Sequence, residues 1–352
     1  MPDVASSAVT PIPTRWVGPI RVSGDAVAGE HEVPLATYET PLWPSVGRGA
    51  RVSRAVEGGI RVTVVDERMT RSVLLVAPDA AAAVSAARAV QGRLAELQAL
   101  VASQSRFAWL LEIRDEVIGN LLYLRLAFTT GDASGHNMVT QAADLVLQDV
   151  LRAEPRLEYG SVSGNLCADK KVSAVNGLLG RGKNVVAELL VPGAVVEREL
   201  RTSVRRLVDL NTRKNLVGGI AAGSLRTANA HYANVLLALY LATGQDAANI
   251  VEGSQGITWA EERGDDLYFS CTLPNLVVGT VGNGKNLPGV ELALERLGCR
   301  EDRAVGANAR RLAALTAAAV LCGELSLLAA QTNPGELMAA HVRLERRAEV
   351  RA

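Results

Sequence analysis

The 352-residue sequence carries no excess charge of either sign and few aromatic side chains. Lysine and arginine together number 37, and aspartate and glutamate also number 37. The protein as a whole therefore has no electrostatic field that attracts nucleic acid or an anionic membrane. An anionic ligand would have to be bound by basic residues that lie close together. Aromatic residues make up only 4% of the chain, which disfavours a stacking surface for single-stranded nucleic acid. We expect neither nucleic acid nor a membrane as a partner.

Cysteine and long apolar runs are also scarce. The four cysteines lie far apart and form no C-x-x-C pair, which argues against a disulfide framework and a zinc cage. We expect no metal site and a reducing, cytoplasmic location. The N-terminal segment has no basic region followed by an apolar one, so it does not resemble a secretory signal. The most apolar stretches are short or interrupted by Glu324, which predicts buried helices in a soluble protein.

The middle of the chain does show a regular alternation of strand and helix patterns. Residues 72–76 form a β-rich run, and residues 78–102 have helical apolar spacing with Asp79 as the N-cap. Next come strand patterns at 106–114 and 118–128, a helix pattern at 134–154 that Pro155 stops, and a strand pattern at 156–164. The order β-α-β-β-α-β predicts a ferredoxin-like unit, and we assign residues 72–162 to one inserted domain.

The flanking segments, residues 1–71 and 163–352, are predicted to form one large discontinuous domain. Strand patterns at 184–191 and 265–273 alternate there with long helical patterns at 193–210 and 306–330. We place a further helix, 227–245, at the centre of this domain. The expected fold class is therefore α+β, with a large helix-rich domain that carries the inserted domain.

Two segments spell G-x-x-x-x-G-K, the beginning of a phosphate-binding P-loop. Both continue with asparagine and lack the Ser or Thr hydroxyl that would hold magnesium. The first, 177–184, is followed by a strand pattern, which argues against a P-loop. The second, 279–286, lies between a strand and a helix pattern, and such a loop suits an anion in any enzyme class. We keep it as a phosphate- or cofactor-facing loop, with a plain tight turn as an equally supported alternative.

A third glycine-rich segment, 129–138, joins a strand pattern to a helix pattern. Gly131 and Gly135 allow close backbone approach, and the free N–H groups of the first helical turn can point toward a ligand. No G-x-G-x-x-G with a distal acidic residue follows a strand, so a dinucleotide would not be held in Rossmann fashion. This segment is therefore the better candidate for a dinucleotide contact.

Several segments in a fixed order resemble the signatures of 3-hydroxy-3-methylglutaryl-coenzyme A (HMG-CoA) reductases, nearest to class I: GDASGHNM, SGNLCADKK, KNLVGGIAAGSLRTANAHYAN, GQDAAN and GTVGNGKN. The similarity runs from about Pro11 to Arg346. Members of this family reduce a thioester to an alcohol with two successive hydrides from NADPH, through a hemithioacetal and an aldehyde. The resemblance implies a soluble enzyme that makes mevalonate and coenzyme A, as a homodimer or higher homo-oligomer with active sites shared between subunits. It also implies that the inserted domain, 72–162, is a nucleotide-binding (NADP) domain and that residues 1–71 and 163–352 form the catalytic domain that binds substrate and CoA. NADH stays open as the hydride donor.

The resemblance also implies a catalytic set. Its members are Glu39 in ATYET, Lys170 in DKK, Asp246 in GQD and His341 in GELMAAH, with Glu336 where an earlier histidine would stand. The Lys170 ammonium would stabilise the oxyanion of the thioester carbonyl, and Asp246 beside it would hold that charge in place. Glu39 would act as an acid near neutral pH. This role requires a raised pKa, which burial or a neighbouring carboxylate would produce. His341 would protonate the leaving thiolate.

Substrate and cofactor contacts carry over in the same way. The acyl-group contacts are Arg71, Ser163, Asp169, Lys171, Lys214 and Asn234, and the contacts near the coenzyme A phosphates are Ser45 and Arg48. The NADPH contacts are Ser105, Arg106, Asp132, Ala133, Ser134, Gly135, Asn137, Met138, Gly282 and Gly284. Without the resemblance, the Asp-Lys-Lys run would be a solvated turn and Lys214 would cap the helix 192–209. His136 and His231 receive no catalytic role.

Some positions depart from the family pattern and keep alternatives open. Tyr38, Pro41, Trp43 and Pro44 surround Glu39 where the family has smaller residues. One alternative is a reductase of the same fold that acts on a different 3-hydroxyacyl thioester. The others are a catalytically silent nucleotide- or CoA-binding module and an atypical NTPase that uses residues 279–286.

Overall fold

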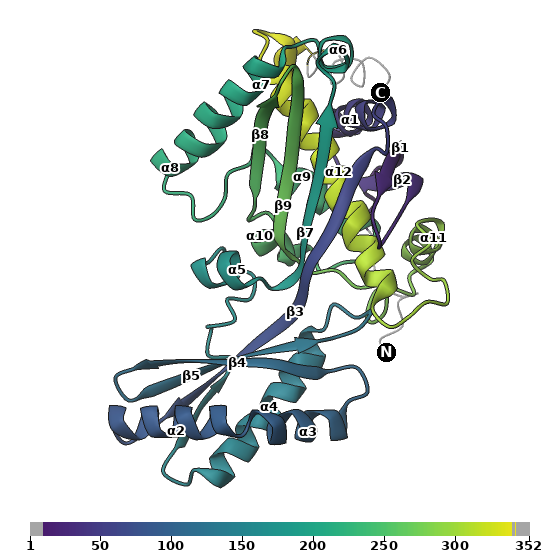
Figure 1. Ribbon diagram of the computed structural model, residues 1–352. Helices are drawn as coiled ribbons and strands as arrows, with labels where there is room; N and C mark the ends of the chain where they lie inside the picture. Colours follow the sequence, from purple (N-terminus) through teal and green to yellow (C-terminus); the bar gives the residue numbers. More distant parts are fainter. Residues whose placement is uncertain (1–9, 340–341, 343–352) are drawn as a thin grey trace.

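The computed structural model describes residues 10–339 and Val342, in a larger and a smaller part stacked along one axis (Figure 1). The strands are β1 (Thr14–Ser23), β2 (Gly29–Ala36), β3 (Ile60–Val76), β4 (Trp109–Ile118), β5 (Leu121–Thr129), β6 (Glu158–Val162), β7 (Gly182–Val191), β8 (Ile257–Arg263) and β9 (Asp266–Leu276). The longer helices are α1 (Leu42–Ala55), α2 (Ala80–Gly92), α3 (Leu94–Gln104), α4 (His136–Ala153), α7 (Val204–Leu210), α9 (Tyr232–Ala242), α11 (Pro288–Arg296) and α12 (Ala307–Gln331). Shorter helical segments are α5 (Ala174–Leu179), α6 (Gly193–Val195), η2 (Val196–Leu200), η3 (Asn211–Gly218), α8 (Gly219–Ala221), η4 (Ala247–Asn249) and α10 (Ile250–Gly253).

Strand β3 runs through both parts of the molecule (Figure 1). Its residues 61–68 pair with β7 in the larger part, and its residues 69–76 pair with β5 in the smaller part. The strand predicted at 72–76 is thus the end of a 17-residue strand. Sequence reading missed the first part because Asp66, Glu67 and Arg68 interrupt the apolar pattern, but these charges are paired with neighbouring side chains.

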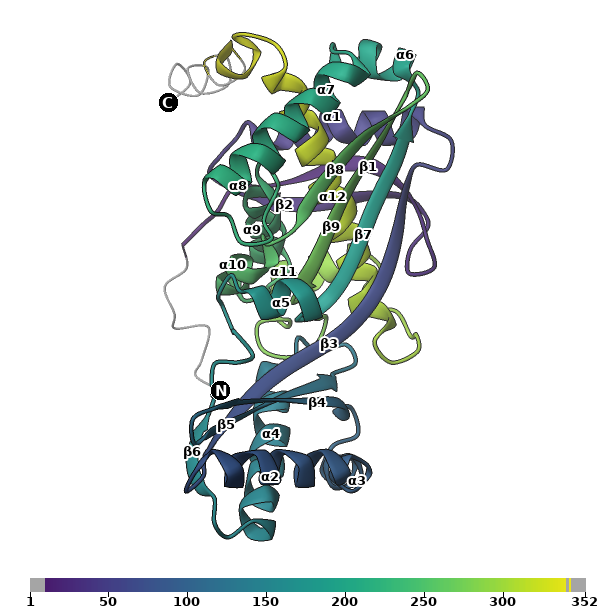
Figure 2. The same cartoon turned by 60° about the vertical axis from the view of Figure 1, so that its left-hand side comes forward.

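The smaller part has the predicted β-α-β-β-α-β order. Its strands lie in the order β4-β5-β3-β6, and every neighbouring pair is antiparallel. Helices α2, α3 and α4 pack on the same side of these strands (Figure 2). Helix α4 buries Val139, Ala143, Val146 and Val150 at helical spacing. The ferredoxin-like arrangement expected from the sequence is confirmed.

The single helix predicted at 78–102 is two helices. Asp79 caps the first of them as expected, since its carboxylate accepts from the Ala82 N–H at 2.7 Å. Helix α2 then ends at Gly92, a weak helix former, and α3 begins at Leu94. Arg93 between them pairs with Glu96 and with Asp149 on α4. The apolar spacing predicted helix correctly but did not mark this break.

The larger part is built on strands in the order β2-β1-β3-β7-β9-β8. The helix predicted at 227–245 is the shorter α9, and the long helix packed against β7, β9 and α1 is α12. Helix α12 is long and apolar enough to span a membrane by length and composition, since an 18-residue stretch of it has a mean hydropathy of 1.9. However, 94% of that stretch is buried in the protein, as in a core helix. The central helix is therefore α12, and the prediction of α9 for this place was wrong.

Other elements were missed or simplified by sequence reading. Helix α1 and strand β8 were not predicted, and the helix expected at 193–210 is interrupted at Arg201, which has a φ of 57°. Beyond α7 the chain stays helical through η3 and α8. One apolar cluster gathers in each part of the molecule, although Val277 joins the cluster of the smaller part from the far end of β9. The assignment of residues 72–162 to a separate domain stays a prediction.

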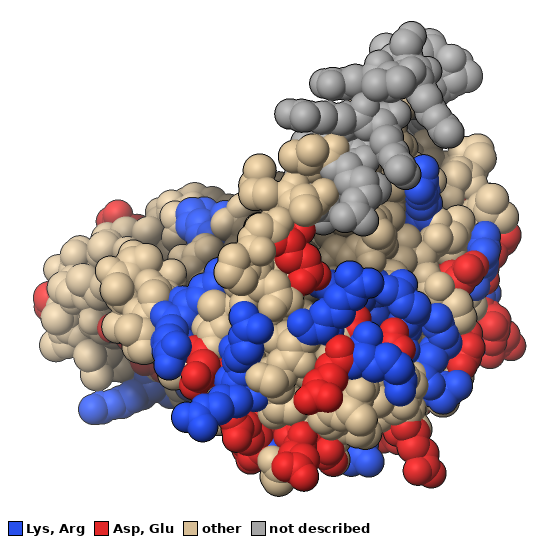
Figure 3. Space-filling view, turned by 90° about the horizontal axis from the view of Figure 1, so that it is seen from above, with Lys and Arg blue, Asp and Glu red and all other residues tan. Residues whose placement is uncertain are grey.

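The end of the molecule that carries α6 and α7 has charges of both signs side by side (Figure 3). Glu199 of η2 pairs with Arg198 at 2.9 Å and lies 3.8 Å from Arg51 of α1. In these contacts an acidic side chain lies next to two basic ones. The visible part of this face therefore has no large patch of a single charge.

Candidate active site

The Asp-Lys-Lys segment lies in a loop between β6 and α5, where the chain passes from the smaller to the larger part. Asn165, Ala168 and Lys170 have positive φ angles of 63°, 45° and 55°, a region that disfavours residues with a Cβ. The loop is held by its backbone: Gly164 N donates to Ser72 O at 3.0 Å, and the Asn176 amide donates to Ala168 O at 3.0 Å. The alternative of a plain solvated turn does not describe this constrained loop.

Lys170 and Asp246 form an ion pair across 76 positions of sequence. Lys170 Nζ lies 2.8 Å from Asp246 Oδ2, and both side chains are partly exposed. The hydrogen bond to Asp246 raises the pKa of Lys170, so its ammonium is charged at neutral pH. For Asp246, burial raises the pKa, but the hydrogen bonds from Lys170 and Ala248 N outweigh burial and lower it. A fixed, permanently charged ammonium is suited to stabilise an oxyanion.

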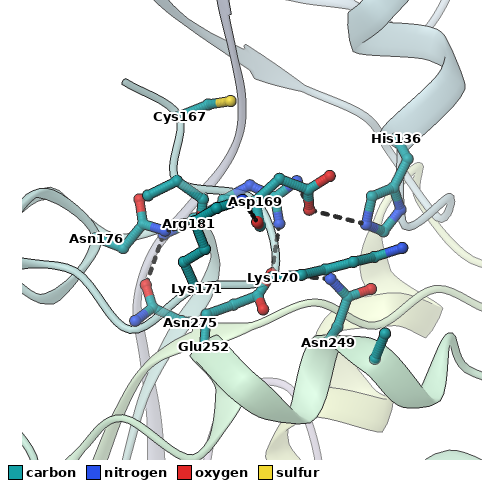
Figure 4. Close-up of polar contacts among 12 residues, drawn as sticks. His136, Cys167, Asp169, Lys170, Lys171, Asn176, Arg181, Asn249, Glu252 and Asn275 are labelled. Carbon is teal, nitrogen blue, oxygen red and sulfur yellow. Dashed lines mark hydrogen bonds and ion pairs between the residues drawn. The ribbon is translucent and has the colours of Figure 1, made fainter. Parts of the chain in front are cut away.

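The Asp169 carboxylate lies in a polar cluster with Arg181 and His136 (Figure 4). Its carboxylate lies 2.8 Å from Arg181 Nη2 and 3.9 Å from Arg71 Nη1. Lys171 Nζ donates to the backbone carbonyl of Asp169 at 3.0 Å. Three predicted acyl-group contacts thus gather in one place, together with an arginine that sequence reading missed.

His136, at the beginning of α4, also points at this cluster (Figure 4). Its Nε2 lies 3.9 Å from Asp169 Oδ1. Burial, followed by the charge of Arg181, lowers the pKa of His136 to about 4. His136 is therefore neutral at physiological pH, although it lies beside a carboxylate.

This pKa shift predicts a loss of stability in acid. An unfolded histidine has a pKa of about 6.5, so between about pH 6.5 and pH 4 the unfolded chain binds the extra proton. Stability contributed by neutral His136 is present above that window and lost as the pH falls through it. We expect His136→Gln to reduce the drop in unfolding free energy between pH 7 and pH 4.5 by on the order of 1 kcal/mol. Chemical denaturation at both pH values measures this, and an identical pH dependence in both proteins would contradict it.

A second group of predicted residues surrounds a cavity of about 520 Å³ in the larger part. Glu39 follows β2, and its Oε2 accepts a hydrogen bond from Asn234 Nδ2 of α9 at 3.0 Å. Ser45 and Arg48 of α1 enter the same cavity. Arg48 pairs with Glu336 at 2.8 Å, and Ser45 hydrogen-bonds to Ser326. Glu39 is exposed, so the burial expected for an acid at this position does not occur within one chain.

Glu324, one turn or less from cavity-lining residues of α12 such as Ser326 and Leu327, is a structural residue that the sequence analysis did not assign. It is fully buried in α12 and accepts hydrogen bonds from the N–H groups of Ala230 and His231 at 2.6 and 3.1 Å. These bonds hold the segment that leads directly into α9, the helix that carries Asn234. In the sequence, Glu324 is the only charged residue in the apolar run 313–330. Such an isolated charge argues against a membrane span and also indicates a buried polar contact.

Lys214 lies within η3, in the middle of a continuous helical segment that runs to α8. The alternative in which it caps the end of a helix at 209 is therefore wrong. Burial lowers the pKa of Lys214, and the nearby charge of Glu324 opposes that shift. A half-buried lysine is a suitable contact for a substrate carboxylate.

The two groups of residues are separate within one chain. In residues 10–339, no hydrogen bond or ion pair joins Lys170 or Asp246 to Glu39 or Asn234. His341, the proposed thiolate acid, lies outside the described residues. The structure therefore forms two half-sites: the lysine half-site around Lys170 and the glutamate half-site around Glu39.

The glycine-rich loops 129–138 and 279–286 lie against each other. Ala133 and Val281 form a β-bridge, and Thr280 N donates to Asp132 O at 2.8 Å. A Cβ on Gly279 would lie 2.3 Å from Ser134 N, so this contact requires glycine. Gln245 hydrogen-bonds to both the N–H and the C=O of Gly279. The loops therefore form one unit that is joined to Asp246 through its neighbour.

The predicted cofactor contacts take several positions around this unit. Gly135, with a φ of 92°, precedes the first turn of α4, the helix that Asn137 and Met138 begin with His136. Asp132 uses both carboxylate oxygens to accept from Gly306 N and Ala309 N at the beginning of α12. Ser105 accepts from the N–H groups of residues 107 and 108, and Arg106 lies over the Phe107 ring. Ser134, Gly282 and Gly284 lie on the two loops, and both glycines have positive φ. Asp132 thus has a structural task that the sequence did not indicate.

Known proteins resemble this chain over most of its length. A family model described as hydroxymethylglutaryl-coenzyme A reductase matches residues 6–346. A 3-hydroxy-3-methylglutaryl-coenzyme A reductase of Aeropyrum pernix is 44% identical over 337 residues, which span 95% of this chain and 79% of that protein. The protein of the same name from Pyrococcus horikoshii is 45% identical over 325 residues, 92% of this chain and 78% of that protein.

A solved structure has the same fold. It is the class II 3-hydroxy-3-methylglutaryl-CoA reductase from Streptococcus pneumoniae bound to NADPH in open conformations, with a TM-score of 0.74 at 19% identity. The match covers 94% of this chain and 88% of that chain. Because the family model spans nearly the whole sequence and the relatives exceed 40% identity, this chain belongs to the hydroxymethylglutaryl-coenzyme A reductase family.

Proposed function

We propose that this protein reduces HMG-CoA to mevalonate and coenzyme A with two molecules of NADPH, in the cytoplasm as a soluble enzyme. Family membership supports the reaction. The observation on the residues themselves that carries the proposal is the Lys170–Asp246 ion pair of 2.8 Å beside the paired glycine-rich loops. In the balanced reaction, two hydrides and two protons convert the thioester into a primary alcohol and a free thiol.

The cofactor contacts proposed above suit an anionic dinucleotide. The first turn of the 18-residue helix α4 presents free N–H groups behind Gly135, and a Cβ on Gly282 would meet nothing, which leaves room at the loop surface. NADPH bound there would supply the hydrides. Arg106 lies over the ring of Phe107, whose carbonyl accepts a hydrogen bond from Thr129 at the beginning of the loop 129–138, so the positive charge of Arg106 is available to a phosphate.

Residues of the chain itself stabilise the oxyanion, bind the acyl group and donate the protons. Lys170 stabilises the negative charge on the carbonyl oxygen, and Asp246 keeps the ammonium in place. Arg71, Lys171 and Lys214 are available to the free carboxylate of the acyl group. Glu39 donates a proton to the oxygen, and His341 donates one to the departing thiolate.

We further propose that a complete site needs two subunits. The lysine half-site and the glutamate half-site do not contact each other in the described part of one chain. Placing the lysine half-site of one copy against the glutamate half-site of a second copy would bury the exposed Glu39 and bring all the proposed groups together. A symmetric dimer forms two such sites.

The test of this function is NADPH oxidation at 340 nm, measured with HMG-CoA, without it, and with NADH in place of NADPH. We expect oxidation that requires the thioester and yields two NADP⁺ for each mevalonate. Release of phosphate from ATP and magnesium would contradict the proposal and favour the NTPase alternative. The absence of NADPH oxidation with any acyl-CoA would favour the silent binding module.

His341→Gln is expected to impair reduction of the thioester more than reduction of added mevaldehyde. Only the thioester step releases a thiolate, which an imidazolium protonates readily. We expect kcat with HMG-CoA to fall by about 100-fold and kcat with mevaldehyde by less than about 10-fold. Steady-state kinetics with both substrates measure this. Equal losses on both would remove His341 from this role.

A related substrate is the second candidate, because prolines line the glutamate half-site. Pro41 and Pro44 border the cavity that contains Glu39. Their rigid rings limit how the cavity can adapt to the acyl group. Comparing kcat/KM for HMG-CoA with that for other 3-hydroxyacyl-CoA thioesters decides between the two.

A further inference from the structure

Arg181 joins the Asp-Lys-Lys loop to the interior of the protein. Its side chain has 0% exposure, and it belongs to none of the sets of residues discussed under the proposed function. Its Nη1 donates to Glu252 Oε1 at 2.7 Å, and its Nη2 lies 2.8 Å from Asp169 Oδ1 (Figure 4). One guanidinium therefore bridges a carboxylate of the core and a carboxylate of the active-site loop.

The inner side of this bridge is rigid. Glu252 is fully buried, and Asn249 donates to the same Oε1 at 2.8 Å. The backbone N–H of Arg181 donates to Asn275 Oδ1 at 2.9 Å. Buried ion pairs are often no more stabilising than well-packed apolar residues. Stability alone therefore does not account for two full charges at this place.

The outer side of the bridge is the strained part of the loop. Ala168 and Lys170, on either side of Asp169, both have left-handed backbone angles. Residues persist in this conformation only where their surroundings hold them. The contact with Arg181 also directs the Asp169 carboxylate into the protein, whereas the neighbouring Lys170 ammonium pairs with Asp246.

We propose that Arg181 is a positioning residue for the reaction: by holding Asp169, it fixes Lys170 toward Asp246 and prevents Asp169 from competing for the Lys170 ammonium. The inference rests on the proposed function, since it assigns Lys170 the task of stabilising the oxyanion. Arginine is suited to this role because its planar guanidinium reaches two carboxylates at once, which a lysine ammonium does not do equally well.

The experiment compares the wild type with Arg181→Met and with the double variant Arg181→Met, Glu252→Gln. We expect Arg181→Met to lower kcat with HMG-CoA by about 100-fold, the effect of a displaced catalytic group, and to lower Tm. The double variant removes the unpaired buried charge of Glu252, so its Tm should return toward the wild-type value. Its kcat should stay low, because Asp169 is still not held. The kcat of Arg181→Lys should lie between that of the wild type and that of Arg181→Met.

Arg93→Met is the matched control. Arg93 also bridges two carboxylates, Glu96 and Asp149, but it lies between α2 and α3, far along the chain from the loop. It should lose stability and keep its kcat. Recovery of kcat together with Tm in the double variant, full kcat in Arg181→Met, or an equal loss in Arg93→Met would each overturn the inference. An inactive wild type would instead refute the proposed function.

Discussion

Lys170→Ala should lower kcat for HMG-CoA reduction by about 10²–10³-fold, because it removes the only charged group placed to stabilise the carbonyl oxyanion in the proposed mechanism. The fold should survive. The Lys170 side chain is 41% exposed and its partner Asp246 is 44% exposed, and such pairs contribute at most about 1 kcal/mol to stability. NADPH oxidation under saturating HMG-CoA measures the loss, and circular dichroism verifies the fold.

Lys171→Ala is the control for this prediction. Lys171 is the neighbouring lysine, but its ammonium donates to the backbone carbonyl of Asp169 instead of pairing with Asp246. As a proposed contact to the acyl carboxylate, it should raise KM more than it lowers kcat. Near-normal turnover in Lys170→Ala, with a correctly folded protein, would falsify the mechanism.

Mixing two inactive variants should restore activity if two subunits share each site. Lys170→Ala damages the lysine half-site and Glu39→Gln damages the glutamate half-site, so a mixed dimer contains one site built from two intact halves. Random mixing makes half of the dimers mixed, which predicts about a quarter of the wild-type activity. The measurement is NADPH oxidation after the two variants are unfolded and refolded together.

The choice of partner variant supplies the control for that experiment. Lys170→Ala mixed with Asp246→Asn should stay inactive, because the 2.8 Å ion pair places both residues in the same half-site. Every site in that mixture then lacks one member of the pair. Restoration in this control, or none in the first mixture, would contradict the shared site.

Much of the fold was accessible from the sequence because its signals were local. Helix α4 was predicted from its apolar spacing and from Pro155, and the strand order of the smaller part followed from the sequence of elements. The central helix was misplaced because α12 is apolar on all sides. A helix without a polar face gives no periodic signal that would separate the core of the protein from its surface.

The proposed site residues were accessible only through their resemblance to a family, and their supports were not accessible at all. Lys170 and Asp246 stand 76 positions apart, so no spacing rule brings them together. Arg181 and Glu252 are charged residues buried by tertiary packing, although the sequence offers each of them as an ordinary surface charge. The sequence therefore did not predict the long-range ion pairs that hold the Asp-Lys-Lys loop.

The continuous strand β3 has a consequence for motion. Within residues 10–339, the chain passes between the two parts of the molecule twice, once as β3 and once through the loop after β6. The first crossing is a strand that is hydrogen-bonded on both sides of the boundary, at Arg68 to β7 and at Met69 to β5, so it resists bending. Any rotation of the smaller part must therefore pivot about β3, and the loop of the second crossing must follow that rotation. This loop contains Lys170, so such a rotation would carry the ammonium that we propose as the catalytic group with it.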